Sequence, residues 1–133
     1  MENNNSFVID NKTYSTSDIE TLKALEDAVS NYVPFNCYSV LGYAEDAVCI
    51  DKEGIDGWKV YLGSRGCENS KNTFDNLIAA GLKFISRLSD STINEALMKR
   101  NFIENLKEGY SFKEIGDFLE AKQYGDDGPK RSR

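Results

Sequence analysis

The sequence predicts a small α+β protein, in which an antiparallel meander of three or more strands is flanked by an N-terminal helix and about three C-terminal helices. Three short runs rich in Tyr, Val, Ile, Cys and Trp follow one another at 37–43, 47–50 and 58–62, with turn-forming residues at 45–46 and 53–57. This pattern is typical of antiparallel strands. On both sides of the runs, apolar residues recur at helical spacing. Helices packed on one small sheet give the α+β class.

Before the strands, the sequence predicts a short strand or hairpin and then a helix. Residues 6–14 carry Phe, Val, Ile and Tyr around an Asn11-Lys12 pair that fits a tight turn at the edge of the sheet. Ser17 and Glu20 form a capping-box pattern that opens the helix, and Pro34 ends it at the preceding residue. Its charged face is expected to be solvated or to contact a partner. Its apolar face consists of Ile19, Leu22, Leu25, Ala28, Val29 and Tyr32.

After the strands, three helices are expected. Asn72 is the predicted cap of the first, and Gly81 within it is expected to allow close approach of the helix to a strand. Capping-box patterns that begin at Thr92 and Ser111 open the other two. Gly125 is the predicted end of the last helix. The apolar residues expected to face the core are Ile93, Ala96, Leu97, Ile103 and Leu106 in the second helix and Phe112, Ile115, Phe118 and Leu119 in the third.

The length of 133 residues predicts one domain, residues 1–125, followed by a flexible C-terminal tail, 126–133. A chain of this size can bury a real core. No apolar run approaches the ~20 residues that a membrane-spanning helix needs, and the N-terminus lacks the basic and apolar regions of a signal peptide. We therefore expect a cytoplasmic protein.

The residue content excludes several kinds of catalytic site. The sequence contains no histidine, so Ser-His-Asp and Cys-His arrangements and histidine-based zinc sites cannot form. Its three cysteines, Cys37, Cys49 and Cys67, have no C-x-x-C spacing, and Cys37 and Cys49 are expected in the core. Neither phosphate-binding glycine pattern occurs. We expect a protein that is not an enzyme, with no catalytic residues, no cofactor and no metal.

Negative charge is concentrated in one part of the chain. The net charge is −6, whereas residues 17–56 alone carry nine acids and two lysines, a net charge of −7. Such a surface favours a basic partner and speeds its association. The alternative is that these acids only keep the protein soluble. The residues predicted to face a partner are Glu45, Asp46, Asp51, Glu53 and Asp56.

Trp58 and Arg65 each have two interpretations. Trp58, at the start of a strand, either fills the rim of the core or anchors a partner, because Trp, Tyr and Arg are enriched among binding hot spots. We include it among the candidate partner-binding residues. Arg65 either recognises a carboxylate or phosphate or pairs with a nearby acid and braces its loop, and the bracing role is favoured.

The stretch 106–119 (LKEGYSFKEIGDFL) is similar to the first helix of a helix-turn-helix module. A DNA reader also needs a recognition helix, and the sequence after Leu119 contains Asp126-Asp127-Gly128-Pro129, which cannot form one. Capping alone explains Ser111 and its partner three residues later. The runner-up function is nevertheless an intracellular adaptor or transcriptional regulator with such a C-terminal segment.

The region from Tyr38 to Leu88 resembles small bacterial immunity proteins, the cognate inhibitors of polymorphic or contact-dependent growth inhibition toxins. The resemblance lies in residues 43–50 (YAEDAVCI), 58–66 (WKVYLGSRG), Phe74 and 85–88 (ISRL). It implies a cytoplasmic protein that binds and neutralises a toxin domain, such as a nuclease. It also implies one copy of the chain in the complex and no direct contact with nucleic acid or membrane.

Overall fold

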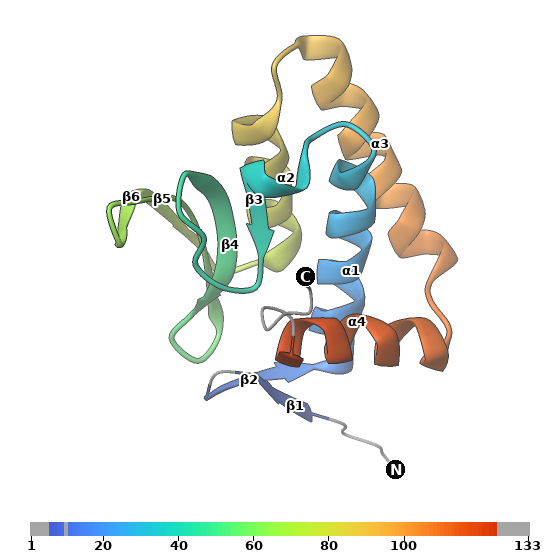
Figure 1. The fold of residues 1–133 in the computed structure, drawn as a ribbon. Coiled ribbons are helices and arrows are strands. Elements are labelled where there is room, and N and C mark those ends of the chain that lie inside the picture. The colour runs from blue at the N-terminus through green and yellow to red at the C-terminus, as the bar shows by residue number, and fades with distance from the viewer. Residues whose placement is uncertain (1–5, 10, 125–133) are drawn as a thin grey trace.

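A computed structural model of the chain describes residues 6–9 and 11–124 (Figure 1). It confirms the α+β class. The predicted helix end at Gly125 and the tail 126–133 lie outside the described residues. In chain order the elements are β1 (Ser6–Ile9), β2 (Lys12–Ser15), α1 (Thr16–Ser30), a 3-10 turn (Phe35–Cys37), β3 (Tyr38–Val40), β4 (Ala47–Glu53), β5 (Gly57–Ser64), β6 (Cys67–Phe74), α2 (Leu77–Leu88), α3 (Thr92–Glu108) and α4 (Phe112–Tyr124).

The main sheet has four strands in the order β3-β4-β5-β6, and it is not the purely antiparallel meander that the sequence predicted. β4, β5 and β6 pair antiparallel, but β3 runs parallel to β4, with Val40 opposite Ile50. The chain reverses at Leu41 and Gly42, whose φ angles are 72° and 118°. It then runs back to the start of β4. A leucine in the left-handed region gives no sequence signal, which is why the parallel strand was not expected.

Strand β6 was missed because its sequence, CENSKNTF, is polar and poor in strand-forming residues. Asn72 lies within this strand and does not cap a helix. The cap of α2 is Asn76, whose side chain accepts a hydrogen bond from Ala79 N at 2.9 Å. The strand conformation of this segment therefore depends more on its backbone pairing with β5 than on the strand propensity of its side chains.

A bulge interrupts the pairing of β5 with β6 between Val60 and Leu62. Ser70, on β6, has a φ angle of 54°. Arg87 of α2 donates hydrogen bonds from its guanidinium to Ser70 O at 2.6 Å and to Asn72 Oδ1 at 3.3 Å. Arg87, part of the ISRL motif, thus fixes the irregular edge strand to the helix beneath it.

The helices cover one face of the sheet, and α2 lies between the sheet and the other helices (Figure 1). Ile50 and Val60 point into this core and are fully buried. The apolar face predicted for α1 is buried apart from Tyr32. In α3 the fully enclosed residues are Met98 and Phe102, whereas Ile93, expected in the core, is 71% exposed.

Gly81 allows a close approach, but to another helix and not to a strand. A β-carbon on Gly81 would lie 2.9 Å from two ring carbons of Phe102 and 3.5 Å from Leu25 Cδ1. The absence of a side chain at Gly81 therefore lets the Phe102 ring of α3 pack directly against α2. The expectation that a strand would occupy this space was wrong.

Of the three helix starts predicted from capping-box patterns, two are displaced and one is confirmed. Helix α1 is capped by Ser15 with Asp18, two residues before the predicted pair. Helix α3 is capped by Ser91, one residue before the prediction. For α4, Ser111 N donates to Glu114 Oε1 at 2.9 Å and Glu114 N donates to Ser111 Oγ at 3.2 Å, as the capping-box pattern predicted.

Helix α4 covers part of the charged face of α1, which was expected to be solvated or to contact a partner. The Tyr110 hydroxyl, in the loop before α4, donates to Asp27 at 3.0 Å, and Lys122 binds Glu26 at 2.6 Å. Lys23 lies over the rings of Tyr110 and Phe118, 5.0 and 5.9 Å from their centroids. This charged face therefore holds the C-terminal helix in place.

Candidate functional site

The outer face of the main sheet, opposite the helices, carries several of the acids that the sequence predicted to face a partner. Because side chains alternate between faces along a strand, Cys49 and Tyr61 point to this face while Ile50 and Val60 point to the helices. The loop of residues 41–46, called the pinned loop below, crosses the outer face. Ala44 in this loop packs over a small buried cluster of Ala47, Cys49 and Tyr61.

Backbone contacts hold the pinned loop against β5. Asp46 N donates to Gly63 O at 2.8 Å. A β-carbon on Gly63 would lie only 2.1 Å from Ala44 O, so the loop can lie this close only over glycine. Asp46 itself has a φ angle of 58°, a conformation that Asp and Asn adopt more readily than most residues.

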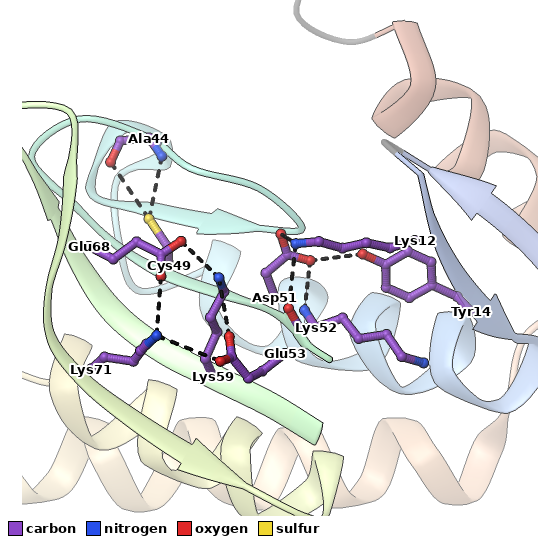
Figure 2. Close-up of polar contacts among 10 residues, drawn as sticks. All are labelled: Lys12, Tyr14, Ala44, Cys49, Asp51, Lys52, Glu53, Lys59, Glu68 and Lys71. Carbon is purple, nitrogen blue, oxygen red and sulfur yellow. Dashed lines mark hydrogen bonds and ion pairs between the residues drawn. The ribbon is translucent and has the colours of Figure 1, made fainter. Parts of the chain in front are cut away.

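The Cys49 thiol is a buried part of the same contact. Ala44 N donates to Cys49 Sγ at 3.4 Å, and the thiol lies 3.6 Å from Ala44 O (Figure 2). Burial raises the pKa of the Cys49 thiol, so it stays protonated and holds the loop instead of reacting. Cys49 is in the core as predicted, but Cys37 is exposed, contrary to expectation.

Glu45 joins the pinned loop to the turn between β5 and β6. Its carboxylate accepts hydrogen bonds from Arg65 N at 2.6 Å and from Gly66 N at 3.1 Å. Arg65 and Gly66 have φ angles of 56° and 74°, as in a type I′ hairpin turn. Within the described residues, Arg65 meets this acid through its backbone and not through its guanidinium.

Tyr43 provides the aromatic part of the surface. Its ring stacks on the buried Tyr61 ring at 6.3 Å and 17° and is 41% exposed. Its hydroxyl donates to Glu45 Oε1. This hydrogen bond raises the pKa of Tyr43 to about 12, and together with the Arg65 and Gly66 N–H groups it lowers the pKa of Glu45. Glu45 is therefore anionic and fixed in position at neutral pH.

Glu53, by contrast, is neutralised within the protein. Lys59 Nζ lies 3.4 Å from Glu53 and 2.8 Å from Glu68, and Lys71 lies 3.7 and 3.8 Å from the same two carboxylates. Figure 2 shows the four side chains side by side on the outer face. Two acids and two bases cancel, so this network adds little to the negative potential predicted for the hairpin.

Asp51 lies inside the fold, contrary to the expectation of an exposed acid. It is 8% exposed and accepts hydrogen bonds from Tyr14 Oη at 2.8 Å, Lys12 Nζ at 3.0 Å and Lys52 N at 2.7 Å (Figure 2). Tyr14 and Lys12 belong to β2. The two side-chain contacts fasten the N-terminal hairpin to β4, and the contact with Lys52 N lies within β4 itself.

Trp58 also belongs to the core and is 4% exposed. Its ring packs 6.0 Å from that of Tyr14, and Lys52 Nζ lies 5.1 Å from its centroid. Of the two interpretations of Trp58, the structure favours the filling of the core rim. It leaves Trp58 too little exposed surface to anchor a partner.

The remaining predicted acids do not form one patch. Glu45 and Asp46 precede β4, whereas Asp56 lies in the turn after it, beside Ile55, which is 84% exposed. Seven residues of extended strand span roughly 20 Å, so the two groups lie at opposite ends of the β4–β5 hairpin. None of these three acids forms an ion pair with another described residue. The predicted partner-facing acids that are neither buried nor in an ion pair therefore divide into two small groups.

Comparisons of the chain with protein-family models, with curated proteins and with solved structures found no match. Among residues 6–9 and 11–124, no group of three or more Cys, Asp or Glu side chains is placed to hold a metal ion. No helix in that part of the chain combines the length and the apolar character needed to cross a membrane.

Sequence reasoning selected Glu45 and Asp46 but missed the aromatic residue beside them. Tyr43 was assigned only to a strand, and the loop around it was not recognised. One available signal was the Arg65-Gly66 pair directly after the third strand-like run, since a glycine there is typical of a two-residue hairpin turn. The hydrogen bonds from that turn to Glu45 depend on the parallel placement of β3, which the sequence did not predict.

Proposed function

We propose that this chain is a protein-binding inhibitor of the immunity-protein type, which neutralises a toxin domain in the cytoplasm. We further propose that the partner binds at the surface formed by Tyr43, Glu45 and Asp46. The observation that carries the proposal is the fixed arrangement on the pinned loop of a half-exposed aromatic ring and two exposed carboxylates that form no ion pair with another described residue. The resemblance of residues 38–88 to immunity proteins supports the same class of function.

The pinned loop suits protein binding because it is ordered before the partner arrives. Contacts with Gly63 and Cys49 fix its backbone, and the 65–66 turn fixes the Glu45 side chain. A surface that is already ordered loses less conformational entropy on association. A tyrosine in its centre offers a large contact area that few rotatable bonds can disorder. The carboxylates of Glu45 and Asp46 favour a basic partner, such as the substrate cleft of a nuclease.

Two experiments test the proposal, a pull-down of the partner and then an assay of growth rescue. The tagged chain is incubated with lysate of its source cells, washed at moderate salt, and the retained proteins are identified by mass spectrometry. We expect one stoichiometric partner, the C-terminal part of a larger secreted protein. Expression of that part alone should stop growth of a bacterial host, and co-expression of this chain should restore it. Retention of nucleic acid without a protein partner would instead favour the regulator function.

The binding surface is tested on the isolated pair. Tyr43→Ser removes the exposed ring, and Asp46→Asn removes one charge from a position whose φ angle Asn also accepts. A central aromatic hot spot contributes 2 kcal/mol or more, so Tyr43→Ser should raise the Kd by about 30-fold. Asp46→Asn should mainly slow association and reduce its salt dependence.

The control for charge is Glu104→Gln, on the exposed side of α3, where the acid forms no ion pair with a described residue. It changes the net charge by the same amount as Asp46→Asn. Equal effects of the two variants on association would mean that only total charge matters. Unchanged affinity in both Tyr43→Ser and Asp46→Asn would place the interface elsewhere.

A further inference from the structure

A second surface lies where α4 meets the N-terminal hairpin, at the end of the molecule away from the pinned loop (Figure 1). It is a groove of about 360 Å³. Its apolar walls come from β1, from the loop after α3 and from the first turns of α4. The main lining residues are Phe7, Glu20, Tyr110, Phe112 and Ile115.

Phe112 marks the edge of the groove and is 91% exposed, the largest exposed fraction among the large hydrophobic residues of the described chain. It is the first residue of α4, directly after the Ser111–Glu114 cap. The cap fixes where the helix begins and thereby fixes the position from which the ring projects. Exposing a phenylalanine costs solvation free energy that a bound partner would recover.

The lining of this apolar groove includes one acidic side chain. Glu20 is the only carboxylate among its lining residues, and it forms no ion pair with another described residue. Burial is the main reason that the pKa of Tyr110 is raised, its hydrogen bond to Asp27 is the next, and the negative charges of Asp27, Glu114 and Glu108 raise it further. Asp27 pairs with Lys23 at 3.3 Å. Glu108 and Glu114 flank the lining residues 110–112 in the chain, so with Glu20 they form the acidic rim of the groove. An apolar groove with an acidic rim complements a segment that is both apolar and basic.

We propose that this groove binds a basic segment of a partner protein, which inserts an aliphatic or aromatic side chain beside Phe112 and places a lysine or arginine next to Glu20. A small ligand inside the groove would leave most of the Phe112 ring in water. A second copy of this chain would bring Glu20, Glu108 and Glu114 close to their own equivalents and would be repelled. This inference is independent of the proposed function, because the groove and the pinned loop share no residue.

The test uses three fluorescein-labelled synthetic peptides of equal length, titrated with the full chain and followed by fluorescence anisotropy. The first is an amphipathic Leu/Lys peptide, the second replaces each Leu by Ser, and the third replaces each Lys by Glu. We expect the Leu/Lys peptide to bind at least about tenfold more tightly than either of the others, because it alone satisfies both the apolar walls and the acidic rim.

The variants identify the site of binding. Phe112→Ser should weaken binding of the Leu/Lys peptide by about tenfold or more, and Glu20→Gln should weaken it less and reduce its salt dependence. Ile93→Ser is the matched control, because it makes the same kind of change at a 71% exposed residue in the first turn of α3. It should leave the affinity unchanged. Circular dichroism verifies that each variant is folded.

Several results would overturn this inference. Equal affinity for the Leu/Lys and Ser/Lys peptides would show attraction to the overall negative charge. Equal affinity for the Leu/Glu peptide would show that the acidic rim plays no part. Wild-type affinity in the folded Phe112→Ser variant would place the peptide elsewhere. A dimer in sedimentation equilibrium that Phe112→Ser dissociates would show that a second copy occupies the groove.

Discussion

Gly63 and Ala44 lie so close that a β-carbon on Gly63 would be 2.1 Å from the carbonyl oxygen of Ala44. At no other described glycine would a β-carbon lie so close to a neighbouring atom. The loop carries Tyr43, Glu45 and Asp46, so the position of the proposed binding surface depends on a residue that a partner does not touch. The packing at Gly63 thus determines where the residues of the proposed binding surface lie.

Gly63→Ala should therefore displace the loop and destabilise the protein by about 1–3 kcal/mol, the usual cost of overpacking. The sign of this change in the free energy of unfolding is informative, because replacing a glycine within a strand by alanine otherwise stabilises a protein. Urea unfolding measures the change. The reactivity of the thiols locates it, because Cys37 and Cys67 are exposed whereas Cys49 lies under the loop. In the wild type two thiols should react quickly, and in Gly63→Ala all three. A protected Cys49 in the variant would contradict this account.

Glu45 should give the protein a pH-dependent stability. Its pKa is lowered in the folded state, first by the Tyr43 hydroxyl and then by the N–H groups of Arg65 and Gly66. The stabilisation is therefore fully present above its unfolded pKa of 4.5 and is lost as the pH falls through the lower folded value. Glu45→Gln should lower the Tm at pH 7, and this loss should shrink as the pH falls below about 4.5.

The control for Glu45→Gln is again Glu104→Gln, which removes one negative charge without removing a hydrogen bond to a turn. Thermal unfolding of the wild type and the two variants between pH 3 and 7 separates the contributions. A constant difference in Tm between wild type and Glu45→Gln across this range would exclude the proposed linkage.

The helices were predictable because their signals are local. Apolar spacing located α1 and α2, and the Ser111–Glu114 pair identified the start of α4. Caps shifted by one or two residues where a second suitable side chain, Ser15 or Ser91, stood nearby. The exposure of Phe112 was not predictable, because whether a helical apolar face is covered depends on elements distant in the sequence.

The arrangement of the acids was less predictable than their presence. Clustering in the sequence suggested one patch, but antiparallel pairing of β4 with β5 sends Asp46 and Asp56 to opposite ends of a hairpin. Partners distant in sequence, such as Tyr14 for Asp51 and Lys71 for Glu53, then decide which acids are used internally. A count of charges along the chain predicts neither the separation of these acids nor their internal partners.

Asp51 and Asp56 should separate stability from surface charge. Asp51→Asn removes the charge from an acceptor that binds Tyr14 and Lys12 in a mostly buried position. Loss of charge-assisted hydrogen bonds should lower the free energy of unfolding by about 1–3 kcal/mol. Asp56→Asn, at an exposed turn, should change it by less than about 0.5 kcal/mol. Urea denaturation of both variants decides the matter, and similar values for the two would show that Asp51 does not fasten the N-terminal hairpin.

Gly81 and Gly116 offer a final comparison between two glycines in helices. A β-carbon on Gly81 would lie 2.9 Å from the Phe102 ring, whereas one on Gly116 would meet nothing within 4 Å. Gly116→Ala should stabilise the protein by about 0.5–1 kcal/mol through helix propensity. Gly81→Ala gains the same propensity but pushes α3 away from α2, so it should destabilise by about 1–3 kcal/mol. If the contact with Phe102 is the cause, the double variant Gly81→Ala with Phe102→Leu should cost less than the sum of the two single changes. Stabilisation by Gly81→Ala alone would show that the helices can separate without loss.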